Sequence, residues 1–197
     1  MTTLKPHGKL LILLILLLTQ VTSTSQEQIS LSVYQDARLM TLGDKQNNKP
    51  GTMNLLMNVK IQTKQKNYGY LVIVPEYEQA DLQDTYKRLS LGVGYTFNRL
   101  YSPNLNFLRD FEVTTTISYG VINRFSNTEG SWSCNGEVSY KVNDWLKVGA
   151  VHQLTERTDL LFRYQDRKIR YSFFFGLEFS PFNFGKKSRE VMWYAAL

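Results

Sequence analysis

The chain has 197 residues, a single cysteine and a formal net charge of +6. This length allows one domain with a sizeable core, and one cysteine excludes an internal disulfide framework. The mild basic surplus is scattered among acidic residues, which argues against nucleic acid as a partner.

Residues 1–25 have the layout of an export signal. Lys5 and Lys9 precede an unbroken Leu/Ile run, Leu10–Leu18, and small polar residues follow up to Ser25. The run is shorter than the roughly 18 residues of a spanning helix, so we expect a signal peptide that is cleaved before Gln26. The alternative is an uncleaved N-terminal anchor. Cleavage would lower the net charge to +4.

The rest of the chain consists of segments with strand-type alternation that are separated by turn signals. Such a series predicts an all-β sandwich or barrel. In chain order, the eight predicted strands are Ile29–Thr41, Thr52–Lys64, Tyr68–Glu78, Arg88–Asn98, Phe111–Ile122, Ser131–Val142, Trp145–Glu156 and Lys168–Phe179. The third is apolar on both faces, so its facing stays open, and Pro75 suggests a sheet edge or a bulge there.

The fourth predicted strand shows the alternation most clearly. Leu89, Leu91, Val93, Tyr95 and Phe97 share one face, and small or polar residues occupy the other. Its length matches the roughly 9–11 residues that a tilted strand needs to cross a bilayer. The pattern therefore fits a membrane-spanning strand as well as a strand of a soluble barrel.

The polar faces indicate which side of the sheet is the interior. Glycine gives solvent nothing to hydrate, but it makes room inside a barrel of about eight strands, whose interior is only wide enough for side chains. We therefore expect the polar faces to point inward, with charges of both signs paired there. The glycines on these faces are Gly92, Gly94, Gly120, Gly149 and Gly176, and the charged residues are Lys60, Arg88, Glu112, Glu137, Lys141, Lys147, Arg170 and Glu178.

Aromatic residues and connection lengths favour the same orientation. Trp and Tyr prefer the head-group level of a membrane, and seven aromatic residues lie near predicted strand ends: Tyr95, Phe97, Phe111, Tyr119, Trp132, Tyr140 and Trp145. Small outer-membrane barrels alternate long outer loops with short periplasmic turns. Here the odd connections are polar loops (43–51, 79–85, 123–130 and 157–167), and two of the even ones, 65–67 and 143–144, are very short. The connection 99–109 breaks this rule.

The segments Tyr140–Val148 and Val93–Phe97 resemble those of the small outer-membrane β-barrels of Gram-negative bacteria, of the OmpA membrane domain, OmpX and OmpW type. The aromatic last strand up to Phe179 is similar to the signal that the barrel-assembly machinery recognises. The resemblance implies an antiparallel up-and-down transmembrane β-barrel of about eight strands over residues 26–180. It also implies the lipid bilayer, lipopolysaccharide and the assembly machinery as partners. Residues 181–197 are then either a periplasmic tail or a sign that the last strand is misplaced.

Few residues suggest chemistry. His152 is the sole histidine after the export signal, and it shares its strand face with Leu154 and Glu156. We expect an interfacial histidine there and no catalytic base. Glu76 and Glu78 are interpreted as rim charges, and Cys134 as a small buried or lipid-facing thiol. The sequence predicts no catalytic residues, no cofactor and no metal site.

Three hypotheses follow. The first is a non-enzymatic outer-membrane barrel with a plugged polar interior, which acts in structure or in surface interaction through its outer loops. The second is an outer-membrane lipid-modifying enzyme that uses His152. The third is a soluble, lipocalin-like barrel that binds an apolar ligand.

Overall fold

The computed structural model describes residues 26–43, 48–64, 68–82, 85–98, 108, 110–160 and 168–183. The predicted export signal, the connection 65–67 and residues 184–197 lie outside this part of the chain. The strands are β1 (Gln26–Asp36), β2 (Asn54–Thr63), β3 (Gly69–Ala80), β4 (Tyr86–Phe97), β5 (Phe111–Arg124), β6 (Asn127–Lys141), β7 (Leu146–Arg157) and β8 (Lys168–Asn183).

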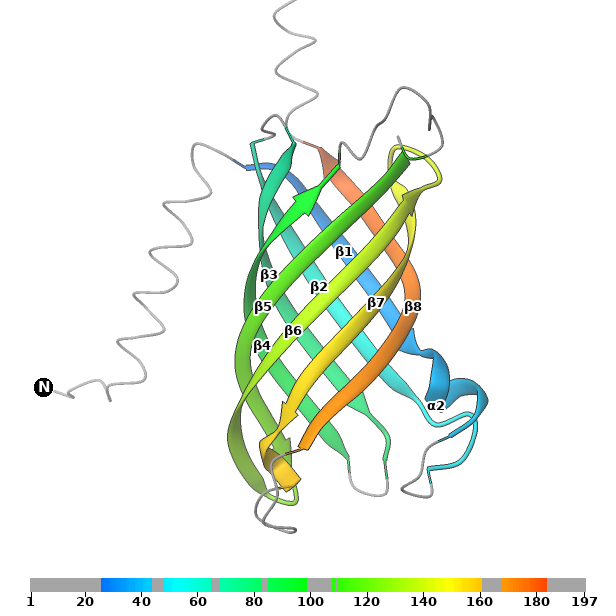
Figure 1. Ribbon diagram of the computed structural model, residues 1–197, viewed down its shortest axis with the longest axis vertical. Coiled ribbons are helices and arrows are strands. Elements are labelled where there is room, and N and C mark those ends of the chain that lie inside the picture. The colour runs from blue at the N-terminus through cyan, green and yellow to red at the C-terminus, as the bar shows by residue number, and fades with distance from the viewer. Residues whose placement is uncertain are drawn as a thin grey trace, which may run out of the picture.

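Each strand pairs antiparallel with the next along the chain, and β1 pairs with β8. The sheet is therefore a closed up-and-down barrel of eight strands, which confirms the predicted fold class (Figure 1). Closure leaves no free sheet edge, which is how all-β proteins avoid edge-to-edge association.

The barrel has two distinct ends (Figure 1). One end carries helix α2 (Ala37–Thr41), the β5–β6 turn and the 3-10 helix η2 (Thr158–Leu160), and we call it the α2 end. At the other, the terminal end, β1 begins and β8 ends. Among the described residues, no helix is long and apolar enough to cross a bilayer.

The side-chain alternation follows the prediction for most strands. On β2, Asn54, Asn58, Lys60 and Gln62 are buried inside the barrel. The facing of β3, which the sequence left open, is now settled, because its even-numbered residues alternate as the buried set from Tyr70 to Ala80. Glu76 and Glu78 are consequently 2% and 1% exposed. Their interpretation as rim charges was wrong.

The first predicted strand ends five residues too late. Residues 37–41 form α2, because the Asp36 carboxylate accepts hydrogen bonds from the backbone N–H groups of Arg38 and Leu39 and caps the helix. An acidic N-cap of this kind satisfies the first unpaired donors of a helix. Leu39 keeps the odd-numbered apolar parity of Ile29, Leu31 and Val33, so the alternation alone did not reveal the change from strand to helix.

The predicted loop 123–130 is also wrong, since β5 and β6 continue through it. They pair as far as Arg124 with Asn127, and the turn consists of Phe125 and Ser126, with φ values of 52° and 63°. Two successive left-handed residues match the right-handed twist of a hairpin. Polar composition had suggested a loop, but backbone pairing needs no apolar side chains.

Pro75 lies neither on an edge nor in a bulge. It pairs opposite Leu91 of β4. On its other side the β2–β3 pairing is interrupted between Asn58–Glu76 and Ile61–Ile73 without a change of register. Proline has no N–H to donate, so a local gap in one ladder is its expected effect. Likewise, β8 extends to Asn183, beyond the predicted end at Phe179, and includes Pro181.

Candidate functional site

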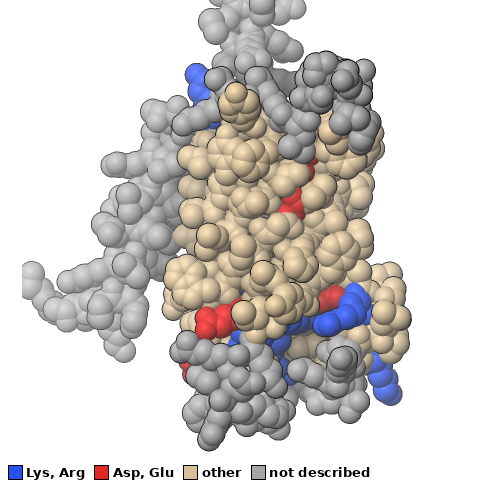
Figure 2. Space-filling view, viewed as in Figure 1, with Lys and Arg blue, Asp and Glu red and all other residues tan. Residues whose placement is uncertain are grey.

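The outer wall of the barrel is apolar. Figure 2 shows a broad band with few charged residues, and Lys, Arg, Asp and Glu gather at the α2 end of that face. Val93, Ile117 and Leu89 illustrate the band, with exposed fractions of 64%, 60% and 60%. Single exposed apolar residues are ordinary on soluble proteins, but a continuous apolar surface marks an interaction site.

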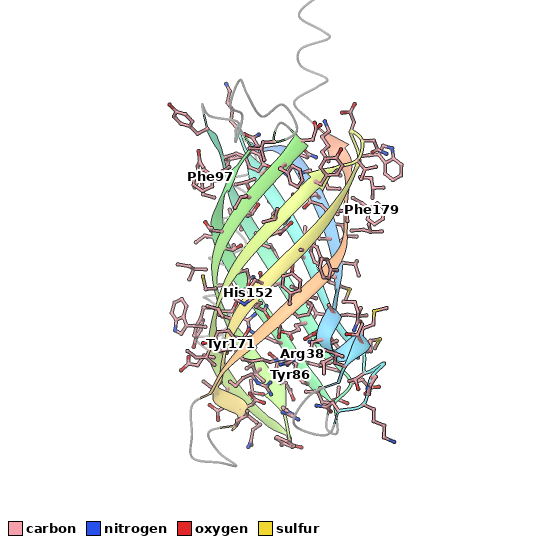
Figure 3. The ribbon with its side chains drawn as sticks, turned by 45° about the vertical axis from the view of Figure 1, so that its right-hand side comes forward. Arg38, Tyr86, Phe97, His152, Tyr171 and Phe179 are labelled. Carbon is pink, nitrogen blue, oxygen red and sulfur yellow. The ribbon has the colours of Figure 1, made fainter. Side chains whose placement is uncertain are left out.

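Aromatic rings lie at two levels of this wall. Figure 3 places Phe97 and Phe179 toward the terminal end, and His152 and Tyr171 nearer the α2 end. The first level contains the ring pairs Tyr95–Phe97, Phe111–Tyr140 and Trp145–Phe179. The second contains Tyr119–Trp132 and His152–Tyr171.

The apolar wall also holds a groove of about 560 Å³ that runs from the end of β2 across β3 to β6. Leu71, Val93, Tyr95, Ile117 and Cys134 contribute to its lining. Cys134 is exposed on this outer surface, so of the two expectations for this thiol the outward-facing one describes its position, and the buried one was wrong.

The interior, in contrast, is polar and charged. Toward the terminal end, a group that we call the lysine cluster brings together residues from five strands. Lys60 of β2 contacts the carboxylates of Glu137 and Glu178. Lys147 lies 2.7 Å from Glu112 Oε2 and 3.1 Å from Glu178 Oε1. The cluster thus alternates cations and anions around the interior.

Two tyrosines complete this cluster. The Tyr34 hydroxyl donates to Glu137 over 2.8 Å, and the Tyr70 hydroxyl donates to Glu112 over 3.0 Å. Glu137 and Glu112 therefore receive a neutral donor in addition to an ammonium group. Buried carboxylates need several such partners to offset the free energy that they lose on leaving water.

A second group, the Arg88 cluster, joins β3, β4, β5 and β6. Arg88 is 1% exposed, and its guanidinium lies 3.5 Å from Glu76 and donates to Ser133 over 2.9 Å. Ser90 and Ser118 donate to the same Glu76 oxygen over 2.9 and 2.8 Å. The buried carboxylate that sequence analysis had assigned to the rim is therefore the centre of an interior network.

The third group fixes the α2 end. Arg170 lies 3.2 Å from Asp36, the capping residue of α2, and 3.7 Å from Glu78. In η2, Asp159 accepts a 2.6 Å contact from Arg157 and a 3.3 Å contact from Arg124. Burial opposes ionisation of Asp159, but the hydrogen bonds and charges of these two arginines outweigh it and lower the pKa of the carboxyl.

Seven of the eight charged residues predicted to face inward belong to these groups. Lys141 is the exception, because it lies at the last position of β6 and its exposed side chain contacts Asp144 in the β6–β7 turn over 2.8 Å. An inward-facing parity places a side chain in the interior only where the neighbouring strands extend beyond it. The sequence shows on which side of a strand a side chain lies, but not how far each strand extends along the barrel axis.

His152 lies on the outer wall, opposite Gly136 on β6 and Phe173 on β8. Its ring centre is 6.3 Å from that of Tyr171. In the described part of the chain it has no serine or carboxylate hydrogen-bond partner, and no set of His, Cys, Asp and Glu residues there has the arrangement of a metal site. Its neighbours on the same outer face include Cys134, diagonally across on β6, and Tyr171 of β8, but no hydrogen bond within the described part of the chain joins His152 to either of them.

The fold and its wall define a closed eight-stranded antiparallel β-barrel with an apolar outside and an ion-paired inside. Neither a family model nor a curated protein matches the chain. Among solved structures, the Neisserial surface protein A is 10% identical over 81% of this chain and 98% of its own, with a TM-score of 0.45. A designed transmembrane β-barrel is 13% identical over 79% and 94%, with a TM-score of 0.45. A second designed protein, TMB2.3, is 10% identical over 82% and 99%, with a TM-score of 0.42.

Proposed function

We propose that this chain is an integral outer-membrane β-barrel with a structural or surface-interaction role and no enzymatic activity. The inverted polarity of the barrel carries the proposal. Apolar side chains such as Ile117 cover its outside, while ionised ones such as Arg88 fill its inside. Water would favour the opposite arrangement, whereas hydrocarbon favours this one, because a bilayer core solvates neither charges nor unpaired backbone groups.

The two aromatic levels support a defined depth in the membrane. Rings at both borders of an apolar band fit the preference of aromatic side chains for the interface on each side of a bilayer. Charged groups at the α2 end (Figure 2) would then lie at the head groups. We place the α2 end outside the cell and the terminal end in the periplasm, with export through residues 1–25 and assembly by the barrel-assembly machinery.

The packed interior favours a plugged barrel over a pore. An eight-stranded barrel is only wide enough for side chains, and here the lysine cluster and the Arg88 cluster occupy successive levels. Opening a path would separate buried ion pairs, which costs several kcal/mol for each unpaired ion. Specificity would therefore lie in the connections at the α2 end and in contacts with the bilayer and lipopolysaccharide.

The native Cys134 allows a direct test. We would attach a nitroxide to this single thiol, reconstitute the barrel in vesicles, and compare relaxation of the label by oxygen with relaxation by a water-soluble nickel chelate. Oxygen concentrates in hydrocarbon, so it should dominate at Cys134. A matched control moves the thiol to the exposed β6–β7 turn, in Cys134→Ser/Asn143→Cys, where the nickel chelate should dominate.

Nickel-dominated relaxation at both positions would contradict membrane insertion and favour a soluble, lipocalin-like barrel. Fractionation gives an independent check, because recovery from the periplasm without detergent would have the same meaning. A folded membrane barrel should in addition show heat-modifiable mobility on a gel.

The enzyme hypothesis makes a separate prediction. His152→Ala should leave the lipid A profile of expressing cells unchanged, because no described residue forms a hydrogen bond with the imidazole that would make it an activated base. A changed profile, with normal heat-modifiable mobility of the variant, would replace our proposal with a lipid-modifying activity.

A further inference from the structure

Helix α2 exposes apolar side chains beside the barrel. Met40 is 60% exposed, and Leu42, directly after the helix, is 79% exposed. Met53, the residue directly before β2, adds a third apolar side chain that is 42% exposed. The helix projects from the side of the barrel at its α2 end (Figure 1). These residues belong neither to the interior nor to the span of the strands.

The exposure is built into the fold, because α2 is held at both ends and on one side. Asp36 caps its first turn while contacting Arg170 and Asn54. Gly43 ends it with a φ of +72°, and its N–H donates to the Arg38 carbonyl. A Cβ at Gly43 would lie 2.2 Å from the Asn48 carbonyl oxygen, so both the space and the backbone angle require glycine there.

Leu39 shows that the helix is two-sided. It is fully buried and packs with Ala80, Leu82, Tyr86 and Ile122, a cluster that closes the α2 end. A soluble loop that anchors itself through one leucine would be expected to carry polar residues on its other side. Met40 and Leu42 make that side apolar instead, and next to the apolar barrel wall they extend a surface of the kind that marks an interaction site.

The neighbouring charges identify the partner's chemistry. Arg38 and Lys49 are exposed in the same connection, and the exposed Asp81 lies beside Met53, whose carbonyl accepts its backbone N–H. These residues leave a surplus of one positive charge. Met53 also continues the outward stripe of β2 that includes Leu55 and Met57. The Gly51 N–H, two residues earlier, donates to the Leu39 and Met40 carbonyls, so α2 lies beside the start of this stripe on the barrel wall.

We propose that α2 is an interfacial anchor, whose Met40 and Leu42 side chains enter the acyl boundary of the surrounding leaflet while Arg38 and Lys49 lie beside the phosphate groups of anionic lipids. The inference rests on the proposed membrane location and deepens it. Short apolar and basic segments bind at this depth because apolar burial and attraction to anionic lipids act together. The partner is therefore a lipid surface that carries a net negative charge on its phosphate groups.

The test uses a fluorescent reporter on the anchor. In a Cys134→Ser background, Leu42→Cys would be labelled with an environment-sensitive fluorophore, and the full chain would be reconstituted in neutral phosphatidylcholine vesicles or in vesicles that also contain phosphatidylglycerol. We expect quenching by lipids with a nitroxide near the head group, little quenching by aqueous iodide, and stronger lipid quenching in the anionic vesicles. Inorganic phosphate added to neutral vesicles should not reproduce this increase.

Arg38→Gln/Lys49→Gln provides the matched variant. Each lost cation should shift the balance between membrane-bound and water-exposed α2 by roughly fivefold, so the effect of phosphatidylglycerol should disappear while heat-modifiable mobility is kept. An increase with inorganic phosphate, or one that survives in this variant, would overturn the lipid-phosphate contact.

If iodide quenches the fluorophore at position 42 in both kinds of vesicle, α2 lies in water and the proposal that it is an interfacial anchor is wrong. If the nitroxide on Cys134 is still relaxed by oxygen in that case, the failure concerns α2 alone and the membrane barrel stands. If the label on Cys134 is also exposed to water, the proposed function itself has failed.

Discussion

The Tyr34 hydroxyl of β1 donates a 2.8 Å hydrogen bond to Glu137 of β6, a strand that lies three positions away around the barrel. Glycine makes the bond possible. Gly176 pairs directly opposite Tyr34 on β8, and a Cβ there would come within 2.7 Å of the tyrosine ring. A Cβ at Gly149, on β7, would lie 3.2 Å from the hydroxyl. The ring crosses the interior in the space that two missing side chains leave.

This space predicts that Gly176→Ala destabilises the barrel. The added methyl would meet the Val33 carbonyl oxygen at 1.9 Å as well as the Tyr34 ring, and overpacking of this kind costs about 1–3 kcal/mol. Gly136→Ala is the matched control, because a Cβ at Gly136 has no neighbour within 4 Å; it should be neutral or stabilising by about 0.5–1 kcal/mol. Urea unfolding in vesicles, followed by tryptophan fluorescence, measures both. Equal losses would show that the interior is not tightly packed at Gly176.

The lysine cluster predicts a non-additive pair of substitutions. Lys60→Met should cost about 3–5 kcal/mol, because it leaves Glu137 and part of Glu178 buried without a cation. Adding Glu137→Gln to Lys60→Met should recover part of this loss, since the uncompensated charge is removed with its partner. A double-mutant cycle from unfolding in vesicles provides the coupling energy. Additive losses would mean that the two charges do not interact in the folded barrel.

The apolar wall predicts a depth-dependent cost of charge. Ile117→Lys, in the middle of β5, should destabilise the barrel in vesicles by about 2–4 kcal/mol, the range for a lysine near the bilayer midplane. Asn123→Lys, at the α2 end of the same strand, should cost about 0–1 kcal/mol. The free energies of unfolding are compared in the same lipid. If Ile117→Lys proves harmless, the wall faces water.

The arginines around Asp159 predict a dependence of stability on pH. The folded-state pKa of Asp159 is lowered from its ordinary value of 3.8, so the ionised carboxylate stabilises the fold above the unfolded-state pKa. This contribution is lost as the pH falls through the lower folded-state pKa. Asp159→Asn should therefore cost about 3 kcal/mol at neutral pH, because Arg124 and Arg157 lose their shared anion.

The difference in the free energy of unfolding between wild type and Asp159→Asn should narrow only below about pH 4. If the difference in unfolding free energy stays constant down to about pH 4 and then shrinks, the result supports the ion pairs of Asp159. If that difference already shrinks between about pH 7 and 5, its pH dependence comes from another group.

Period-2 alternation determined most of this fold in advance, for a physical reason. Successive side chains of a strand point to opposite faces, so a strand with one apolar and one polar face, such as β4, reveals its length and its two surfaces locally. The glycines on the polar faces added the orientation, since a narrow interior needs small residues beside Arg88 and Lys147. For the same reason, His152 could be assigned to the outer wall from its parity alone, whereas Cys134 was left open between a buried and an outward position.

Tertiary structure decided what no local pattern contains. β3 is apolar on both faces, so only its neighbours β2 and β4 determine that Glu76 and Glu78 point inward. Partners such as Tyr34 and Glu137 are 103 residues apart and meet because the barrel closes. β1 likewise ends where it does because Asp36 caps α2, and Arg170 of β8 contacts the Asp36 carboxylate. This cap also determines which side of α2 is exposed. The period of the sequence shows which side of its own strand a side chain lies on. Only closure of the barrel decides which side chains from distant strands meet in the interior.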